Sequence, residues 1–320
     1  MAEIIQRDGG WAFDGSTVRI TPGLHRSVPL FRQTYGEISV PLEAVAGVVH
    51  EAERRRGRLR LRLREGADPL LQATGGRLPD AADPYSLSVG TDPSGVAEYL
   101  AEEIRRALLL DRIPREPAGA YLLPGPPVPV SVRSSDGTVS FDGTRVRIDW
   151  ADTSDRVKRA TGPRIIDLDD VVRVEWLPNS GHGDGFLRFA TRGTECSALP
   201  PEKDPYALDL WGSPRRDLLT ALIATAVTAR LPHPSTRTGA DAGRPRQAPL
   251  VPSQSDHHDV LLRRLRELGE LRRDGVLTDE EFTVTKAAIL RGFHQRHPTD
   301  REAPGGAVTE PGGRRRRGTS

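Results

Sequence analysis

The apolar residues of the first two thirds of the chain alternate with polar residues over short stretches. They include Val18, Ile20, Leu59, Leu61, Leu63, Leu87 and Val89. A period of two places every second side chain on the same face of a β-strand, so one face is buried and the other faces water. Each stretch therefore predicts a half-buried strand.

Two later stretches have the period of a helix. Between Ser94 and Leu110 the apolar residues recur every three or four positions, and the same spacing returns between Ser213 and Leu231. This spacing places one apolar stripe along an α-helix. Ser94 and Ser213 are residue types that cap helix N-termini, so the pattern predicts two amphipathic helices that start there.

The chain repeats itself in order. The segment DGGWAFDGSTVRI, Asp8–Ile20, returns as DGTVSFDGTRVRI, Asp136–Ile148, and DPYSLSV, Asp83–Val89, returns as DPYALDL, Asp204–Leu210. Between these blocks VPLEAVAGV precedes GRLRL in the first copy, and IDLDDVVRV precedes GFLRF in the second. Matching blocks in one order are typical of repeats. We therefore interpret the chain as a tandem duplication of one domain.

Each copy is predicted to contain several antiparallel strands followed by one helix, which is an α+β sandwich or open barrel of about 100 residues. In both copies Phe-Asp-Gly predicts a hairpin turn. Asp-Pro-Tyr is predicted to begin the last strand, with Tyr packed beneath the helix. Arg19 and Arg147 follow Asp14 and Asp142 at equivalent positions, so we predict an ion pair across each hairpin.

The duplicated blocks FDG-x-x-VRI, L-x-x-V-x-x-V, G-x-LR and DPY resemble the actinobacterial family called domain of unknown function 4429. The resemblance implies a pleckstrin-homology-like fold, in which strands close into a barrel plugged by a C-terminal helix, and it implies no catalytic residues. We therefore expect an α+β chain with two tandem pleckstrin-homology-like domains, at residues 1–111 and 130–232, each capped by a C-terminal helix.

Composition changes outside the two copies. Residues 112–129 contain the run PGPP and are predicted to form a stiff Pro-rich linker. Residues 233–255 are rich in polar residues, Gly and Pro, which predicts a disordered linker. Residues 256–294 are predicted to form a helical hairpin. Residues 295–320, which end in GGRRRRGTS, are predicted to be a disordered basic tail.

The predicted hairpin turns at Asp274 and Gly275, and Thr278 with Glu281 forms a capping box that starts its second helix. The pattern is similar to the short C-terminal domain called SHOCT. The residues that carry this resemblance are Leu271, Gly275, Leu277, Thr278, Glu281 and Phe282. The resemblance implies a role in self-association or regulation, and no chemistry.

A hairpin of this size is too small to bury enough surface to fold alone, so its apolar stripe requires a partner. We expect self-association, because an identical copy is the simplest complementary partner. The expected oligomerisation residues are Leu261, Leu265, Leu268, Leu271, Phe282, Ile289 and Leu290.

The overall composition limits the classes of function that the chain can have. The chain has 46 basic and 44 acidic residues, and a net charge of +2 provides no general attraction for nucleic acid or membranes. The single cysteine, Cys196, excludes an internal disulfide and a multi-thiolate metal site. No apolar run is long enough to span a bilayer, and no signal peptide is visible. We expect a cytoplasmic protein without a cofactor.

Few residues indicate chemistry. The histidines that could converge at one end of the predicted hairpin are His257, His258, His294 and His297. They border segments that are predicted to be disordered, whereas histidine ligands of a metal are usually buried and oriented by neighbouring groups. We therefore predict no metal site, and the sequence alone does not decide whether these histidines bind a metal. The glycine-rich loop PNSGHGDG joins two predicted strands and lacks the following helix of a phosphate-binding loop. No set of residues predicts an enzyme active site.

One basic face lies between Glu53 and Arg64, partly in a loop and partly along a predicted strand. An anionic headgroup or a nucleic acid could bind there. The candidate residues are Arg54, Arg55, Arg56, Arg58 and Arg60. A solvated strand face that protects a sheet edge is the interpretation we favour, because the second copy offers only Arg188 and Arg192 in this region.

The sequence therefore favours a non-enzymatic binding or scaffold protein. Its tandem domains would bind a protein partner, and its hairpin would associate with a second copy. The alternative is a polyanion binder that recognises anionic membrane headgroups or nucleic acid through the Arg54–Arg64 face and the basic tail. We do not favour this alternative, and the sequence names no specific ligand.

Overall fold

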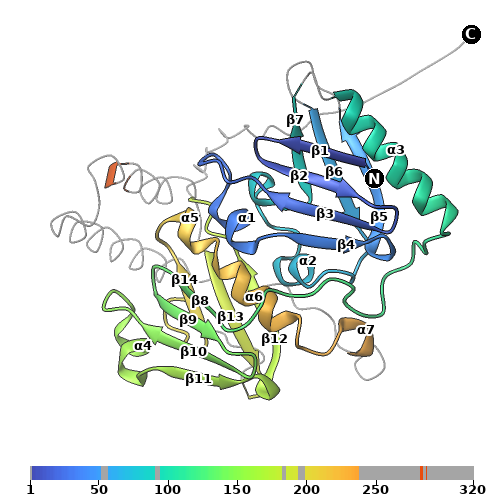
Figure 1. The fold of residues 1–320 in the computed structure, drawn as a ribbon. Coiled ribbons are helices and arrows are strands. Elements are labelled where there is room, and N and C mark those ends of the chain that lie inside the picture. Colours follow the sequence, from blue (N-terminus) through green and yellow to red (C-terminus); the bar gives the residue numbers. More distant parts are fainter. Residues whose placement is uncertain are drawn as a thin grey trace, which may run out of the picture.

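The structure is a computed structural model that describes residues 2–51, 57–90, 94–181, 185–193 and 199–237, together with residues 282, 283 and 286. Over these residues the chain is a mixed α+β protein with four antiparallel sheets (Figure 1). The sheets and helices belong to two units of similar construction. We call residues 2–111 module 1 and residues 130–232 module 2.

Module 1 contains a four-stranded sheet of order β1-β2-β3-β4 and a three-stranded sheet of order β5-β6-β7. The strands are β1 (Ala2–Gln6), β2 (Gly9–Phe13), β3 (Thr17–Pro22), β4 (Ile38–Pro41), β5 (Val45–Glu51), β6 (Gly57–Leu63) and β7 (Ser86–Val89). The helices are α1 (Leu30–Tyr35), α2 (Pro69–Thr74) and α3 (Ser94–Leu110), with short 3-10 turns η1 (Leu42–Ala44) and η2 (Asp80–Ala82). Helix α3 has the bounds that the sequence predicted.

Module 2 has the same plan, with sheets of order β11-β10-β9-β8 and β12-β13-β14. The strands are β8 (Val130–Arg133), β9 (Gly137–Phe141), β10 (Arg145–Trp150), β11 (Arg164–Asp167), β12 (Val171–Leu177), β13 (Gly185–Thr191) and β14 (Ala207–Leu210). The helices are α4 (Arg156–Thr161), η3 (Leu168–Asp170), α5 (Pro214–Asp217), α6 (Thr220–Thr228) and, after the module, α7 (Pro234–Arg237). Helix α2 has no counterpart among the described residues between β13 and β14.

The strand register confirms the duplication. In module 1 the last strand pairs so that Gly57 of β6 lies opposite Val89 of β7. In module 2 the same blocks pair so that Gly185 of β13 lies opposite Leu210 of β14. Both Asp-Pro-Tyr blocks therefore lead into equivalent strands, as the repeats predicted.

Both Phe-Asp-Gly hairpin turns are confirmed. Asp14 Oδ1 accepts hydrogen bonds from the backbone N–H groups of Ser16 (2.9 Å) and Thr17 (2.8 Å), and Asp142 Oδ1 accepts the equivalent two in module 2. Gly15 and Gly143 have φ angles of 108° and 111°. Only glycine adopts this backbone conformation without strain, so the sequence fixes the turn at both places.

The Asp-Pro-Tyr blocks form a turn before the last strand, and β7 and β14 begin one residue after Tyr. Asp83 Oδ1 accepts the N–H of Tyr85, and Asp204 Oδ1 accepts the N–H of Tyr206, both at 2.9 Å. The prediction that the strand starts at Asp was therefore wrong by three residues. The aspartate side chain accepts the N–H group of the tyrosine, which a strand would use for pairing with its neighbour. This hydrogen bond favours a turn.

The second predicted helix is interrupted. Instead of one helix over Ser213–Leu231, α5 ends at Asp217 and α6 begins at Thr220. Thr220 Oγ1 donates to the carbonyl of Asp217 at 2.5 Å, and Ala221 N bonds to the carbonyl of Leu218 at 3.1 Å, three residues back. This tighter bonding ends the first helix, because a side chain competes for a carbonyl of its last turn. Ser213 is the N-cap residue of α5, but its side chain makes no capping hydrogen bond.

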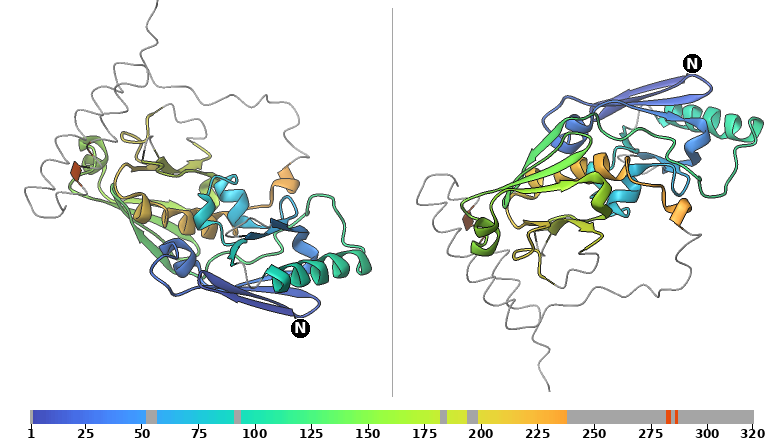
Figure 2. Two further views of the ribbon diagram at one scale, coloured as in Figure 1. Left: turned by 90° about the horizontal axis from the view of Figure 1, so that it is seen from above. Right: turned by 90° about the horizontal axis from the view of Figure 1, so that it is seen from below.

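The two modules share a continuous hydrophobic core. Helix α2 of module 1 packs against α6 and β12 of module 2, and α1 contacts α5. The views in Figures 1 and 2 place α2 between the two sets of sheets, beside α6. Module 1 therefore supplies a structural element to module 2.

The Pro-rich segment between the modules is part of this packing. Ala118 N donates to the carbonyl of Glu65 (2.7 Å), and Leu122 N donates to the carbonyl of Ala67 (2.8 Å). Leu123 is buried in the core. The segment is thus held along the loop that precedes α2.

Residues 233–237 belong to the described structure, although they fall in the segment 233–255 that composition predicted to be disordered. His233 Nε2 lies 3.0 Å from the carbonyl of Gly66, and its ring contacts Tyr121 edge to face at 4.7 Å. Ser235 Oγ donates to the carbonyl of Gly119 at 2.8 Å. The chain therefore leaves module 2 by crossing back onto module 1.

Within the part of the chain that the structure describes, none of the helices has the length and apolar character that a membrane crossing requires.

Candidate functional site

The first candidate is the surface of module 2 that β12 and α6 form together and that α2 covers, which we call the β12–α6 groove. Trp176 of β12 is buried and donates its indole N–H to Thr220 Oγ1 of α6 at 2.9 Å. Helix α2 lies against both elements, and Arg77 Nη1, just after α2, donates to the carbonyl of Trp176 at 3.3 Å. Every residue of α6 is buried. The groove is therefore filled by a helix from module 1.

The sequence of α2 accounts for its position. Asp68 caps its N-terminus by accepting the N–H groups of Leu70 (3.0 Å) and Leu71 (3.2 Å), and Pro69 occupies the first turn. Leu70 is fully buried. The Tyr85 hydroxyl donates to Asp68 at 2.8 Å, so the Tyr of Asp-Pro-Tyr supports α2. Burial raises the pKa of Asp68 to about 6, although these three hydrogen bonds oppose the rise.

Module 1 has an equivalent surface, formed where α3 packs against β5, which we call the β5–α3 groove. His50 lies opposite Leu59 in the ladder, as Trp176 lies opposite Leu187, so the two side chains hold equivalent positions. His50 Nδ1 lies 2.8 Å from Glu98 Oε2 of α3. Thus the same strand position holds the last helix in both modules.

The β5–α3 groove differs from its counterpart in polarity and exposure. Arg105 donates to Glu98 (3.0 Å) and Glu102 (3.3 Å), and these two glutamate side chains are 54% and 57% exposed. The hydrogen bonds from His50 and Arg105 lower the pKa of Glu98. This surface therefore carries exposed carboxylates paired with Arg105, whereas the equivalent surface of module 2 is covered by α2.

Each module also contains a buried ion pair at the end of its sandwich. In module 2, Lys158 of α4 is fully buried and its Nζ lies 2.5 Å from Asp136 Oδ2. Lys158 also donates to the carbonyl of Ala207 (2.8 Å), and Asp136 accepts the N–H of Asp209 (2.9 Å). Burial raises the pKa of Asp136, and the charge of Lys158 opposes that rise.

Module 1 has the same arrangement with Arg32 of α1 and Asp8, whose closest charged atoms are 3.7 Å apart. Asp8 accepts the N–H of Ser88 at 3.1 Å, as Asp136 accepts that of Asp209. Both pairs join the first hairpin, the short helix and the last strand. Because the cations are almost completely buried, a substrate has no access to them. We interpret both pairs as structural.

A second buried carboxylate of module 2 holds the start of α5. Asp217 accepts hydrogen bonds from Ser135, Asn179 and the N–H of Gly212, at 3.1 to 3.3 Å. Burial raises the pKa of Asp217 to about 6, against the effect of these donors. All of its partners are structural groups, so this carboxylate joins loops and has no free reactive side.

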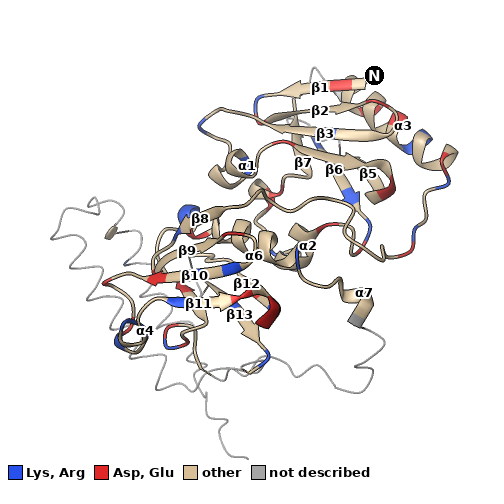
Figure 3. Ribbon diagram, turned by 60° about the horizontal axis from the view of Figure 1, so that its bottom comes forward, with Lys and Arg blue, Asp and Glu red and all other residues tan. Residues whose placement is uncertain are grey.

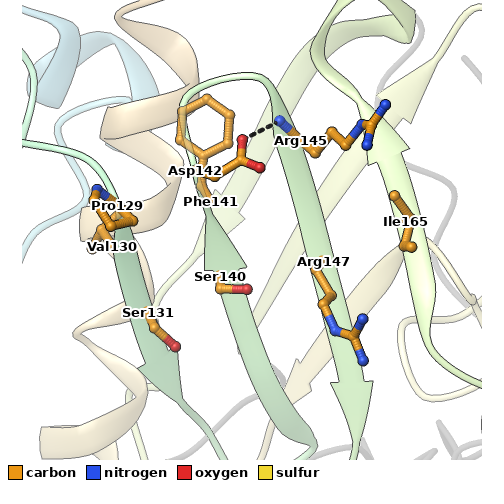
Figure 4. A pocket seen from close by; sticks show the side chains of 9 residues that line it. All are labelled: Pro129, Val130, Ser131, Ser140, Phe141, Asp142, Arg145, Arg147 and Ile165. Carbon is orange, nitrogen blue, oxygen red and sulfur yellow. Dashed lines mark hydrogen bonds between the residues drawn. The ribbon is translucent and has the colours of Figure 1, made fainter.

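Another candidate is a shallow hollow of about 340 Å³ on the outer face of the β8–β11 sheet (Figure 4). Ser131, Ser140, Arg147 and Ile165 lie in one row across the four strands, with Arg145 and Asp142 at one end. Arg145 pairs with Asp167 at 2.8 Å, and Arg147 pairs with Asp149 at 2.7 Å. Both pairs are exposed, and such pairs contribute little to stability.

These ion pairs correct a prediction. Arg147 pairs with Asp149, and Arg19 of module 1 pairs with Glu37 at 3.5 Å. The predicted partners, Asp14 and Asp142, instead accept the backbone N–H groups of their own turns. Side chains on one face of a sheet contact their neighbours on that face. Each arginine therefore pairs with an acidic residue on its own face and not with the aspartate of the nearby turn.

Comparison with known protein families matches the family described as Domain of unknown function (DUF4429) to residues 11–105 and 139–228. The matches begin in β2 and β9 and end in α3 and α6. Together they cover more than half of the chain. The chain belongs to the DUF4429 family. No curated protein matches it.

The basic face of the first DUF4429 module is largely engaged within the module. Arg58 and Arg60 of β6 both pair with Asp80, at 3.2 and 3.1 Å. Arg64 donates to the carbonyls of Glu116 (3.0 Å) and Glu43 (2.8 Å). Arg54, Arg55 and Arg56 lie outside the described residues. In Figure 3 basic and acidic segments are interspersed over both modules.

The predicted oligomerisation residues lie outside the described part of the chain, with the exception of Phe282. Lys286 Nζ lies 5.8 Å from the centre of the Phe282 ring. His257, His258, His294, His297 and Cys196 also lie outside the described residues. Among the described residues, no group of three or more histidine, cysteine or acidic side chains is placed to hold a metal ion.

Sequence reasoning missed α2 and the two buried ion pairs of the DUF4429 modules. The signal for α2 was present, because Asp68-Pro69 is a helix start followed by the apolar pair Leu70 and Leu71. It was overlooked because α2 interrupts the repeat. For the ion pairs, the signal was the recurrence of Asp8 as Asp136 at the start of the repeated blocks.

Proposed function

We propose that this DUF4429 protein is a non-enzymatic cytoplasmic scaffold. In this proposal its two modules bind a protein partner, and its C-terminal SHOCT-like hairpin associates with a second copy. The observation that carries the proposal is the β12–α6 groove, which binds a helical segment, α2. The same fold, present twice, thus has a surface suited to helices of other polypeptides.

The proposal assigns a pleckstrin-homology-like fold to each module. Its support is the order of elements, in which a four-stranded and a three-stranded antiparallel sheet are followed by one C-terminal helix. Helix α3 packs against β1 and β5, which belong to different sheets, and α6 packs against β8 and β12 in the same way. A helix that bridges two sheets closes one end of a barrel.

The chemistry of the buried side chains supports a binding role. Four deeply buried charged groups, Lys158, Asp136, Asp217 and Asp68, are each satisfied by groups of the fold itself. A catalytic acid or base needs access to a substrate. Accessible polar surfaces of the described residues include the β5–α3 groove and the shallow hollow of module 2, which suit recognition.

The hairpin supports self-association through its sequence. Its apolar stripe runs from Leu261 to Leu290, and burial of each such side chain is worth about 1.5–3 kcal/mol. A helical pair of this size cannot cover that stripe by itself. The polyanion alternative has less support, because Asp80 already pairs with both Arg58 and Arg60.

Light scattering after size exclusion tests self-association. We compare the full chain with a chain that ends at Arg237, which keeps every described strand and helix of both modules and the contacts of His233 and Ser235. At tens of micromolar the full chain is expected to be oligomeric and the shortened chain monomeric. Leu265→Asp and Phe282→Asp are expected to act like the truncation.

The matched control is Leu24→Asp, which places the same charge on a leucine of module 1 that is 90% exposed and should leave the oligomer intact. Equal monomeric masses for the full and shortened chains would contradict self-association.

A further inference from the structure

We propose that the edge strand β11 of module 2 pairs with an extended segment of a partner protein, which adds a fifth strand to the β8–β11 sheet. The segment runs antiparallel to β11 and carries a basic residue two positions before an apolar residue. The inference rests on the proposed function, in which the modules bind a protein partner. It adds a surface separate from the β12–α6 groove, and the kind of segment that this surface binds.

The register of β10 and β11 shows which backbone groups of β11 point away from the sheet. Leu168 N donates to the carbonyl of Thr144, in line with the register of the two strands. In an antiparallel ladder every second residue bonds to the neighbouring strand. The N–H and C=O groups of Ile165 and Asp167, which alternate with Leu168, therefore point away from β10. No turn or loop backbone of the described chain bonds to them, and β11 is the outermost strand of its sheet in Figure 1.

The equivalent edge of module 1, strand β4, is closed by a proline. Leu42 N donates to the carbonyl of Ser16, so the same alternation places Ser39 and Pro41 on the outward side of β4. Proline has no N–H to offer to a further strand, and it commonly protects sheet edges. The residue at the position of Pro41 in module 2 is Asp167. Strand β11 therefore keeps a donor that β4 lacks.

One side chain beside this edge is apolar and exposed. Ile165 is 57% exposed on the outer face of the sheet and borders the shallow hollow shown in Figure 4. Residues directly opposite each other in a sheet lie on the same face and contact each other. An added strand therefore places one of its side chains against Ile165, and an apolar side chain covers that isoleucine best.

The end of β11 is acidic. A polar hollow of about 460 Å³ lies there, and its lining includes Asp167, Asp169, Asp170 and Arg145. Arg145 pairs with Asp167 at 2.8 Å, and within the described ranges no ion pair involves Asp169 or Asp170. A side chain opposite Asp167 on an added strand lies beside this hollow. The excess of carboxylates favours a basic side chain there and disfavours an acidic one.

The antiparallel direction sets the order of these two side chains. In the partner segment, the residue opposite Asp167 precedes the residue opposite Ile165 by two positions. A basic residue, any residue and then an apolar residue therefore match the edge. A second copy of β11 has this order at Arg164 and Ile166, but the backbone groups of these two residues face β10. The edge therefore fits another polypeptide better than a second copy of itself.

A library of random heptapeptides displayed on phage tests the pairing, with the full chain as bait. We expect the enriched peptides to share a basic residue two positions before an apolar residue. The edge variant is Asp167→Pro, which gives β11 the residue that closes β4. The backbone accepts it, because the φ angle is −70° at Asp167 and −65° at Pro41. The control variant is Asp167→Asn, which removes the same charge and keeps the N–H.

An enriched peptide is then synthesised, and its affinity for each protein is measured by fluorescence anisotropy, after thermal unfolding has shown that the variants are folded. We expect Asp167→Pro to weaken binding about tenfold. Asp167→Asn is expected to weaken it less, and to reduce the preference for the basic residue over glutamate in the peptide. In the wild type, the bound peptide is expected to slow amide exchange at Ile165 and Asp167 about tenfold.

The absence of any enriched sequence would overturn the proposal, and so would unchanged amide exchange at Ile165 and Asp167 in the wild type. Slow exchange at these amides without peptide, lost on dilution, would assign the edge to a second copy and also contradict the proposal. Peptides that bind the wild type and Asp167→Pro equally would show that the modules bind a partner through another surface. In that case the β11 pairing fails while the proposed binding of a partner remains.

Discussion

The β12–α6 and β5–α3 grooves are built from the same repeat and have different contents. Helix α6 is buried on all sides, with α2 covering one of them, and its residues are small or apolar, including three threonines. Helix α3 is amphipathic and keeps glutamates on its open side. The comparison shows that the composition of the last helix depends on whether another helix covers it. The strands and turns, in contrast, are the same in both modules.

The same lesson applies to single positions. Trp176 and His50 occupy one place in the ladder. In module 2 this residue is a buried tryptophan bonded to Thr220 of α6, and in module 1 it is a buried histidine bonded to Glu98 of α3. The residue at this position therefore matches the surroundings that it has in each module.

The largest effect is expected from Leu70→Asp, which disrupts the packing of the helix that covers the β12–α6 groove. Leu70 is fully buried between the modules, so an aspartate there removes a core side chain and buries an unpaired charge. We expect a loss of at least about 5 kcal/mol in unfolding free energy. Urea denaturation of the chain 1–237 measures it. The matched change is Leu109→Asp on exposed α3, expected within about 0.5 kcal/mol of the parent. Equal losses in the two variants would show that α2 is not a buried plug.

The next effect concerns the two buried ion pairs. Lys158→Ala leaves Asp136 buried without its cation, which should cost about 3–5 kcal/mol. Arg32→Ala should cost less, because the Asp8 side chain is 22% exposed and lies farther from its partner. The double variant Lys158→Met with Asp136→Asn should recover part of the loss, since it removes both charges. Denaturation of the four proteins measures these values, and a larger cost for Arg32→Ala would reverse the interpretation.

A smaller effect is expected from pH. Burial raises the pKa of Asp217 to about 6, above its ordinary value of 3.8. Between these values the folded protein holds a proton that the unfolded chain has released, so stability falls as the pH rises from about 4 to 6, by about 1–3 kcal/mol for this group. Asp217→Asn should flatten the dependence, and Asp68→Asn should do the same in module 1. Thermal unfolding over this pH range measures the slopes, and an unchanged slope in both variants would refute the assignment.

The sequence predicted the elements of the fold well where one residue type dictates a local conformation. Gly15 and Gly143 fixed two turns, and the repeated blocks predicted equivalent strands. Helix α3 was found because its covered and open sides alternate at helical spacing. Helix α6 was less accurately predicted, because a helix buried on all sides loses that contrast.

The candidate site was harder to predict. The contacts of α2 with α6, of Arg32 with Asp8 and of His233 with Gly66 join residues far apart in sequence. Local patterns carry information about turns and periodicity, but they do not reveal which distant side chains meet. The Arg54–Arg64 face is an example. The sequence predicted its strand but did not predict the pairing of its arginines with Asp80.

The contribution of α2 to module 2 also has a consequence for the order of synthesis. Residues 69–74 leave the ribosome long before residues 220–228, so α2 is made well before the groove that receives it. Until α6 is made, α2 lacks the surface of α6 and β12 that it packs against in the complete chain. A chain that stops early therefore displays an apolar helix that the complete chain hides, and chaperones and proteases that recognise exposed apolar segments can distinguish the two.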